Sequence, residues 1–171
     1  GTGEKILNPV TQIYLEEGAV FTLDTAQIGG VDSTVRKTEV YMEADSKLYV
    51  MEKLMTHDSQ TAVSDMTVEM NGAGSSAQIV SRSVAKGNSV QTFHPIAIGN
   101  ALCHAHVQCD SIIMDKAQIS SIPEINARDI DAQIIHEAAI GRINNEQILK
   151  LRTFGMTEEE AEAVIIEDFL A

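Results

Sequence analysis

The sequence contains no tryptophan, and only 12 of its 171 residues are Lys or Arg against 25 Asp or Glu, giving a formal net charge of −13. Proteins that hold a nucleic-acid backbone do so with clustered Lys and Arg. Here the longest basic run is the pair Arg36 and Lys37. The same negative charge repels anionic membrane surfaces. We therefore expect neither a nucleic acid nor a membrane as a partner.

Long apolar segments and cysteines are also scarce. No segment approaches the roughly 20 apolar residues that a membrane span needs, and no charged and then apolar leader opens the chain. The two cysteines, Cys103 and Cys109, are too few for a disulfide-stapled secreted scaffold and fit reduced thiols. These features predict a cytoplasmic protein. With 44% hydrophobic residues, the chain has enough apolar side chains for one core.

The first four fifths of the chain consist of short runs rich in Val, Ile, Thr and Ser, which favour strands. Turn residues such as Asn71-Gly72 and Gly99-Asn100 separate the runs. A sandwich, a barrel and a solenoid all fit such a series. The later runs are short, evenly spaced and poor in aromatic residues, which favours a parallel β-helix over residues 1–140, with a sandwich as the alternative. The expected strands are 11–15, 19–23, 35–42, 47–55, 62–70, 77–84, 89–93, 102–108, 111–114 and 118–122.

The last fifth of the chain, residues 144–171, changes to helical spacing. A short helix is expected from Asn144 to Gly155, a residue suited to the left-handed turn that ends a helix. Thr157 precedes Glu160 by three positions, which predicts a capping box and a second helix. The apolar face of that helix is expected to contain Ala161, Val164, Ile165 and Phe169. Its many acidic residues indicate a solvated face, with docking of a basic partner as the alternative.

The densest cluster of reactive side chains is Cys103-His104-Ala105-His106-Val107-Gln108-Cys109. Side chains alternate along a strand, so the two cysteines would share one face and the two histidines the other. The cysteines would lie about 20 Å apart at roughly 3.4 Å per residue, too far to bind one ion together. A self-contained zinc site needs pairs such as C-x-x-C, which are absent. Buried packing is therefore the simpler interpretation of the cysteines, and a zinc-binding or metal-storage module is an alternative.

A second polar pair, His136-Glu137, lies where the expected strands give way to helices. It would supply a nitrogen and a carboxylate as metal ligands or as an acid–base pair, or it caps an edge at the surface. The motifs of nucleotide-binding proteins and common hydrolases are absent, and His57-Asp58 with downstream serines is too weak a signal for a triad. We therefore expect no enzymatic activity of the chain itself.

Five segments in the same order resemble the SufB/SufD family, the paired core components of the SUF iron–sulfur cluster assembly machinery. Residues 77–87 resemble the family's strand and turn of the form xxIVSKGIxxG, and Gln108-Cys109-Asp110-Ser111-Ile112-Ile113 resembles the QCDSLL of SufB. His136-Glu137-Ala138 resembles the family's HEA. The closing helices are matched by Gly141-Arg142-Ile143, Glu146-Gln147-Ile148, Leu151-Arg152, Gly155-Met156 and Glu158-Glu159-Glu160-Ala161.

The resemblance implies a mainly β fold, a right-handed parallel β-helix followed by two short C-terminal helices. Cys109 falls on the SufB cysteine regarded as central to cluster formation, Glu137 on the acidic residue thought to act with it, and His136 on a histidine found in both SufB and SufD. A thiolate, a carboxylate and an imidazole together suit a transient iron–sulfur cluster, because oxygen and nitrogen ligands hold a cluster less permanently than thiolates alone. Cys103 matches no family position and is expected in the core.

The resemblance also implies partners. A SufC-type ABC ATPase would dock on residues 144–171 and hydrolyse the ATP, and a SufB/SufD-like subunit would pair with the β-helix as a homo- or heterodimer. A cysteine desulfurase or sulfur carrier would be a further partner. The residues expected to contact the ATPase are Ile148, Leu151, Glu158 and Glu159.

Some positions depart from the family pattern. Leu149-Lys150 replaces an aromatic pair, and Phe154-Gly155 stands where Arg-Gly is common. Family members are usually longer, so the chain resembles the C-terminal part of one, or a short relative. Two other functions remain open: a SufD-like structural subunit without cluster ligands, and a carbohydrate-active β-helix protein. The absence of Trp disfavours the latter, since sugar grooves are usually lined with aromatic residues.

Overall fold

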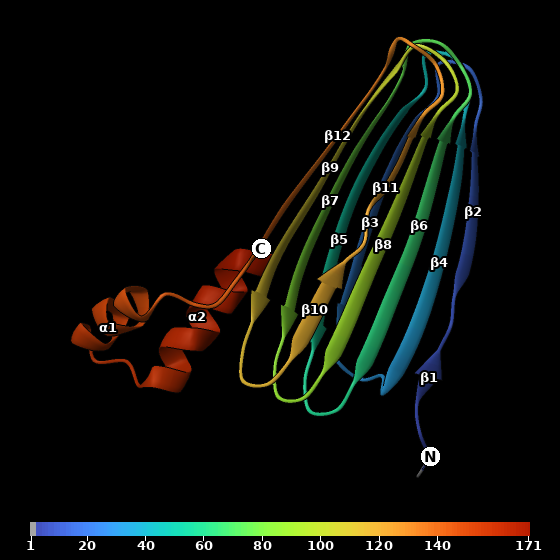
Figure 1. Cartoon of the computed structure of the whole chain (residues 1–171). Helices are drawn as coiled ribbons and strands as arrows, with labels where there is room; N and C mark the ends of the chain where they lie inside the picture. The colour runs from blue at the N-terminus through green and yellow to red at the C-terminus, as the bar shows by residue number, and fades with distance from the viewer. Residues whose placement is uncertain (1–2) are drawn as a thin grey trace.

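Along most strands the side chains alternate between buried and exposed, as expected when one face of each strand lies in a core. The strand β6 (Thr61–Met70) alternates without a break from Ala62 to Met70. The computed structural model, which describes residues 3–171, forms a parallel β-helix followed by two C-terminal helices (Figure 1). The fold class expected from the sequence is confirmed.

Two parallel sheets face each other across the core, and the chain crosses between them after nearly every strand. Sheet A contains β1 (Ile6–Leu7), β2 (Val10–Leu15), β4 (Ser33–Met42), β6, β8 (Val90–Gly99), β10 (Gln118–Ser121) and β11 (Glu124–Ala127). Sheet B contains β3 (Val20–Ile28), β5 (Lys47–Thr56), β7 (Ser75–Ala85), β9 (Cys103–Ile113) and β12 (Ala132–Gly141).

The register repeats from one coil to the next. Val20 pairs with Lys47, and Lys47 pairs with Ser76, so one coil takes 27 to 29 residues. Each interior side chain therefore stacks on the equivalent side chain of the next coil. The first and last strands of sheet A are interrupted, since β1 and β2 both pair with β4, and β10 and β11 both pair with β8. The interruptions fall at Pro9 and Pro123, which have no N–H to donate to a ladder.

The interior changes character along the strand direction. The half near the turns at residues 43–46 and 71–74 is apolar, and Met42, Val68 and Ile79 are among its most deeply buried side chains. The other half, which leads to the turns at residues 57–60 and 86–89, contains many buried polar groups. These include Glu52, Ser64, Ser81, Ser83, Gln91 and Ser111. Polar chemistry is thus concentrated inside one half of the β-helix.

Both helices begin where the sequence predicts, and the first ends just before Gly155, as expected. They are α1 (Asn145–Thr153) and α2 (Glu158–Leu170). The Glu160 amide donates to Thr157 Oγ1 at 3.2 Å and the Thr157 amide donates to Glu160 Oε2 at 2.8 Å, which completes the expected capping box. Gly155, between the helices, has a φ of +93°, a conformation that favours glycine.

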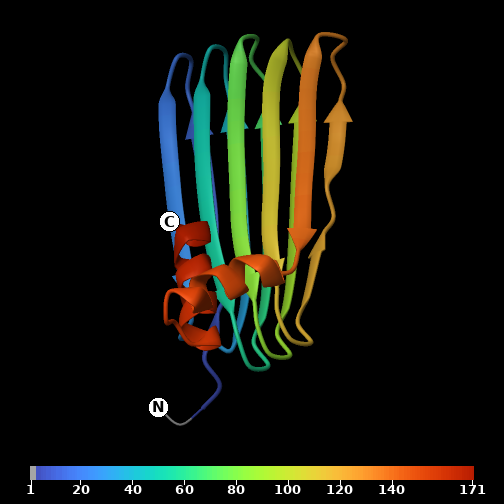
Figure 2. The ribbon, with the colours of Figure 1, turned by 90° about the vertical axis from the view of Figure 1, so that its left-hand side faces the viewer.

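Helix α2 lies against the outer face of sheet B near the lower strand ends (Figure 2). Ile166 is buried against Val84 and Met114, while Val164 is 41% exposed. The apolar face expected for this helix was therefore wrong at Val164, and Ile166 takes its place in the contact. The partly buried residues around Ile166 are Met55, Ile112, Ile143, Phe169 and Leu170.

Five strand assignments differ from expectation, and two of them are the short strands β1 and β11, which were not expected. One continuous strand, β9, replaces the two expected at 102–108 and 111–114. Strand β8 continues through Pro95, because Pro95 falls opposite the interruption between β10 and β11, where no ladder hydrogen bond is needed. Strand β12 was not expected at all, and it carries the His136-Glu137 pair.

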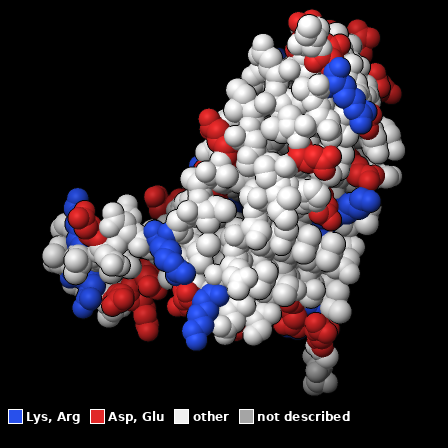
Figure 3. Space-filling model, in the orientation of Figure 1, with Lys and Arg blue, Asp and Glu red and all other residues white. Residues whose placement is uncertain are grey.

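Charged side chains lie at the strand ends, on the helical hairpin and across the upper half of the visible face of the β-helix, while the lower middle of that face is largely uncharged (Figure 3). Within residues 3–171, no helix has the length and apolar character needed to cross a membrane.

Candidate functional site

The last two strands of sheet B bring Cys109 and His136 together. Both side chains point into the β-helix, Cys109 from β9 and His136 from the adjacent strand β12. Cys109 is paired in register with Ala138, two residues beyond His136, so the two side chains are diagonal neighbours on the same face. Cys109 Sγ lies 3.4 Å from His136 Nε2. The structure thus joins two of the three side chains expected to act on the cluster.

The third expected residue, Glu137, points the other way. It follows His136 directly in a strand, so its carboxylate lies on the outer face of sheet B. There Glu137 Oε2 is 3.3 Å from His106 Nε2, a contact between β12 and β9. The polar residues at the end of sheet B therefore form two separate pairs, Cys109 with His136 inside and His106 with Glu137 outside.

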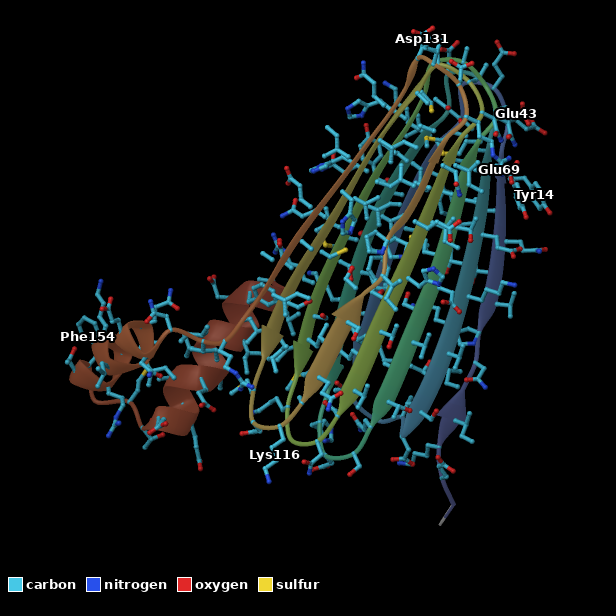
Figure 4. The ribbon with its side chains drawn as sticks, viewed as in Figure 1. Tyr14, Glu43, Glu69, Lys116, Asp131 and Phe154 are labelled. Carbon is cyan, nitrogen blue, oxygen red and sulfur yellow. The ribbon has the colours of Figure 1, made fainter. Side chains whose placement is uncertain are left out.

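Cys109 also lines an internal cavity. Only 3% of Cys109 is exposed, and the cavity leaves about 10 Å³ for the centres of water-sized molecules, room for about one water. Ser83 and Ser111 hydrogen-bond to each other in its wall, with 2.8 Å between the two hydroxyl oxygens. Figure 4 shows sulfur atoms, in yellow, between the two sheets. The polar members of the cavity wall are Glu52, Ser64, Ser81, Ser83, Gln91, Thr92, Cys109, Ser111 and Ser121.

Burial controls the protonation of these groups. It raises the pKa of the Cys109 thiol to about 11, and the nearby Asp110 and Glu52 carboxylates act in the same direction. Burial also lowers the pKa of His136. At neutral pH the pair is therefore a thiol beside a neutral imidazole. A metal ion would displace the thiol proton on binding, because the thiolate is the ligand form.

The site offers a sulfur and a nitrogen ligand, which suit iron, zinc or an iron–sulfur cluster. Within residues 3–171, no three His, Cys, Asp or Glu side chains converge as a preformed metal site. Cys103 lies in the apolar half of the core at 5% exposure, as expected, and neither cysteine forms a disulfide. The arrangement is therefore suited to holding a group weakly at the end of the β-helix.

The residues expected to contact an ATPase lie on the helical hairpin. Ile148 and Leu151 of α1 are half-buried, while Glu158 and Glu159 are exposed at the start of α2. Helix α1 contains no buried residue. Phe154, at the far tip of the hairpin in Figure 4, is 74% exposed. The hairpin therefore presents apolar side chains that nothing in the described chain covers.

Glu52 was not singled out from the sequence. Glu52 occupies an inward position in the alternating strand Leu48, Val50, Glu52, Leu54, so the alternation itself places a carboxylate in the core. His106 was assigned correctly to the face opposite the cysteines. The contact between His106 and Glu137 could not be predicted, because strand β12 was not recognised in the sequence.

A family model described as "SUF system FeS cluster assembly, SufBD core domain" matches residues 2–169. An iron–sulfur cluster assembly SufBD family protein of Methanocaldococcus jannaschii is 28% identical over 98% of this chain and 54% of its own length. A relative of the same description in Archaeoglobus fulgidus is 28% identical over 96% of this chain and 45% of its own length. A relative of the same description in Pyrococcus horikoshii is 30% identical over 99% of this chain and 52% of its own length. The chain thus spans about half the length of these relatives.

With its parallel β-helix and the family model covering nearly every residue, the chain belongs to the SufBD family of the iron–sulfur cluster assembly system.

Proposed function

We propose that the chain is a core scaffold subunit on which a nascent iron–sulfur cluster is built and from which it is transferred. The observation that carries the proposal is the Cys109 thiol 3.4 Å from the His136 imidazole at the last coil of the β-helix. A thiolate is the usual cluster ligand, and an imidazole is a weaker one that suits release. Glu137, on the outer face of the same strand, would act on the cluster from the edge of the sheet.

The work of ATP hydrolysis would belong to a SufC-type ABC ATPase docked on the hairpin of α1 and α2. The proposed contact surface contains Ile148, Leu151, Glu158 and Glu159, with the exposed apolar residues Leu149 and Phe154 beside them. The chain itself would not be an enzyme. It would act in the cytoplasm, pair with a second SufB/SufD-like subunit, and receive sulfur from a cysteine desulfurase or its carrier.

A second candidate function is a SufD-like structural subunit that carries no cluster. The burial of Cys109 favours this alternative, because a thiol with a pKa near 11 and 3% exposure also fits simple packing. The two candidates differ in whether Cys109 is needed for cluster formation.

Replacing Cys109 with Ala separates the two. In cells that depend on this chain, Cys109→Ala is expected to abolish the activity of an iron–sulfur reporter enzyme while the purified variant keeps the circular dichroism of the unchanged chain. Cys103→Ala is the matched control, since Cys103 is equally buried but lies in the apolar half of the core. Full reporter activity in Cys109→Ala would rule out the cluster role and leave the structural subunit.

A further inference from the structure

The outer face of strand β9 carries two histidines in consecutive outward positions. His104 and His106 are separated only by the inward-facing Ala105, so both side chains leave the same face of sheet B. Their Cα atoms are about 6.6 Å apart at roughly 3.3 Å per residue. His104 is exposed, and 25% of the His106 side chain is exposed. Both imidazoles can therefore be reached from solvent, on the side of the sheet opposite Cys109.

The contact with Glu137 orients one of the two rings. Glu137 Oε2 lies 3.3 Å from His106 Nε2. An ionised carboxylate only accepts hydrogen bonds, so in a neutral ring the proton is on Nε2 and Nδ1 keeps a free lone pair. Metal-binding histidines commonly have this arrangement, in which a carboxylate accepts from the nitrogen that does not bind the ion.

The register shows where the free nitrogen points. Glu137 pairs with Gln108, two residues beyond His106, whereas His104 lies two residues before it. The two nitrogens of an imidazole lie on opposite sides of the ring. A ring whose Nε2 faces Glu137 therefore presents Nδ1 towards His104.

Another histidine–carboxylate pair, on sheet A, lacks the second imidazole. His94 Nδ1 lies 3.5 Å from Asp65 Oδ1. The neighbouring outward positions on β8 are Thr92 and Ile96, neither of which offers a nitrogen ligand. Two imidazoles at alternate positions with a carboxylate beside one of them are thus a feature of β9 and β12 alone among the residues that the structure describes.

We infer that His104 and His106 form a two-point binding site for a divalent transition-metal ion, with Glu137 as the residue that positions His106. Imidazole suits Zn²⁺, Ni²⁺ and Cu²⁺, and the negative net charge of the chain favours a cation. No three His, Cys, Asp or Glu side chains converge in the described part of the chain, so water fills the remaining coordination positions. A site with two protein ligands at the surface is weak and exchangeable.

The inference goes beyond the proposed function and does not depend on it. The Cys109 and His136 side chains point into the β-helix, and the backbone of their two strands separates them from the outer face. An ion held by His104 and His106 is thus distinct from one held by the interior pair.

Calorimetric titration of the full chain with Ni²⁺, in a buffer that does not bind metals, tests the inference. The unchanged chain is expected to bind one ion. His104→Gln and His106→Gln are each expected to raise the dissociation constant at least about tenfold, because either change leaves a single imidazole. His94→Gln is the matched control and is expected to leave the dissociation constant unchanged, since its imidazole also lies beside a carboxylate.

Glu137→Ala tests the positioning role. It is expected to raise the dissociation constant for Ni²⁺ about tenfold, the usual effect of removing a carboxylate that orients a histidine ligand. NMR of the ring nitrogens in the metal-free chain gives a second measurement. The unchanged chain should carry the His106 proton on Nε2, and the variant should show a mixture of both tautomers. The same tautomer and the same affinity in both chains would remove Glu137 from the site.

Three results would overturn the inference: no binding of Ni²⁺ by the unchanged chain, an unchanged dissociation constant in His104→Gln or His106→Gln, or loss of binding in Cys109→Ala. The last result would place the ion at the interior pair. Circular dichroism of each variant identifies any that fails to fold. The reporter assay with Cys109→Ala is read separately, so the failure of the outer site leaves the proposed function standing, and the reverse also holds.

Discussion

At the scale of single residues, burial holds both members of the Cys109 and His136 pair in their neutral forms. The Cys109 thiol has a pKa of about 11, against an ordinary value near 9. We expect the rate at which iodoacetamide alkylates Cys109, expressed as a fraction of its value at high pH, to rise between pH 9 and 11 in the folded chain. In the urea-unfolded chain the rise should come near pH 9. Mass spectrometry of the Cys109 peptide measures both. A folded-state midpoint at or below 9 would contradict the desolvation argument.

Glu52 should make the stability of the chain depend on pH. Burial raises its pKa above the ordinary value of 4.5, so the folded state favours the neutral acid. The stability this provides is fully present below pH 4.5 and is lost as the pH rises through the folded-state pKa. Glu52→Gln is therefore expected to equal the unchanged chain at pH 4 and to exceed it at pH 7 by on the order of 1 kcal/mol.

Urea unfolding at the two pH values measures this difference. Glu69→Gln, which removes a carboxyl group from the outer face of sheet A, is the matched control. A Glu52→Gln variant that is less stable than the unchanged chain at pH 7 would mean that Arg36 compensates the ionised carboxylate.

The residue-level prediction from sequence succeeded where strands were recognised. Alternation along 103–109 correctly separated the cysteines from the histidines, and it is sufficient to place Glu52 inside. It did not show that the side chains of His136 and Glu137 point to opposite faces. Strand β12 was not recognised, because its short apolar run is followed by alanines. The opposite directions of the His136 and Glu137 side chains could therefore not be predicted.

At the scale of elements, α2 is held to the β-helix mainly by Ile166, with Phe169 and Leu170 partly buried beside it. Ile166→Ala is expected to weaken this contact by about 2–4 kcal/mol, the usual loss for a buried aliphatic side chain. Hydrogen exchange of α2 amides should quicken while the sheet amides keep their protection. Val164→Ala, at a position that is 41% exposed, is the control and should change the hydrogen exchange of neither α2 nor the sheets. Faster exchange throughout the sheets would show instead that α2 is part of the β-helix core.

A different prediction concerns helix α1, which contains no buried residue. If the hairpin is the docking surface for the ATPase, then Phe154→Asp should reduce capture of the ATPase in an anaerobic pull-down at least about tenfold, because an exposed apolar side chain at an interface centre contributes most of the binding. Tyr14→Asp, 68% exposed on sheet A, is the control. Equal capture by both variants would move the docking surface elsewhere.

Element boundaries could be predicted from sequence wherever local chemistry fixes them. The capping box at Thr157 and the turn at Gly155 are local, and both were found. The end of β8 is set by a neighbouring coil, because Pro95 is tolerated only through the interruption at residues 122–123 of the next strand. Such a boundary depends on register between coils, which one coil's sequence does not contain.

At the scale of the whole molecule, the β-helix ends in unpaired strand edges and exposed isoleucines. The edges of β10, β11 and β12 have no neighbour beyond them in the described chain. Ile122, Ile125 and Ile135 are 53%, 46% and 48% exposed at this end. An open apolar edge is a template for pairing with another strand, so this end is where the proposed second subunit would bind.

A charge on β12 tests that proposal. Ile135→Lys is expected to raise the dissociation constant of a self-paired dimer at least about tenfold, because the new ammonium group must lose its water in the interface. Val20→Lys, 64% exposed on β3 at the opposite end, is the matched control. Both changes make the net charge of −13 less negative, which by itself favours association. A loss of pairing in Ile135→Lys alone, seen by sedimentation velocity, would therefore reflect the edge and not the overall charge. Equal effects of the two variants would remove β12 from the interface.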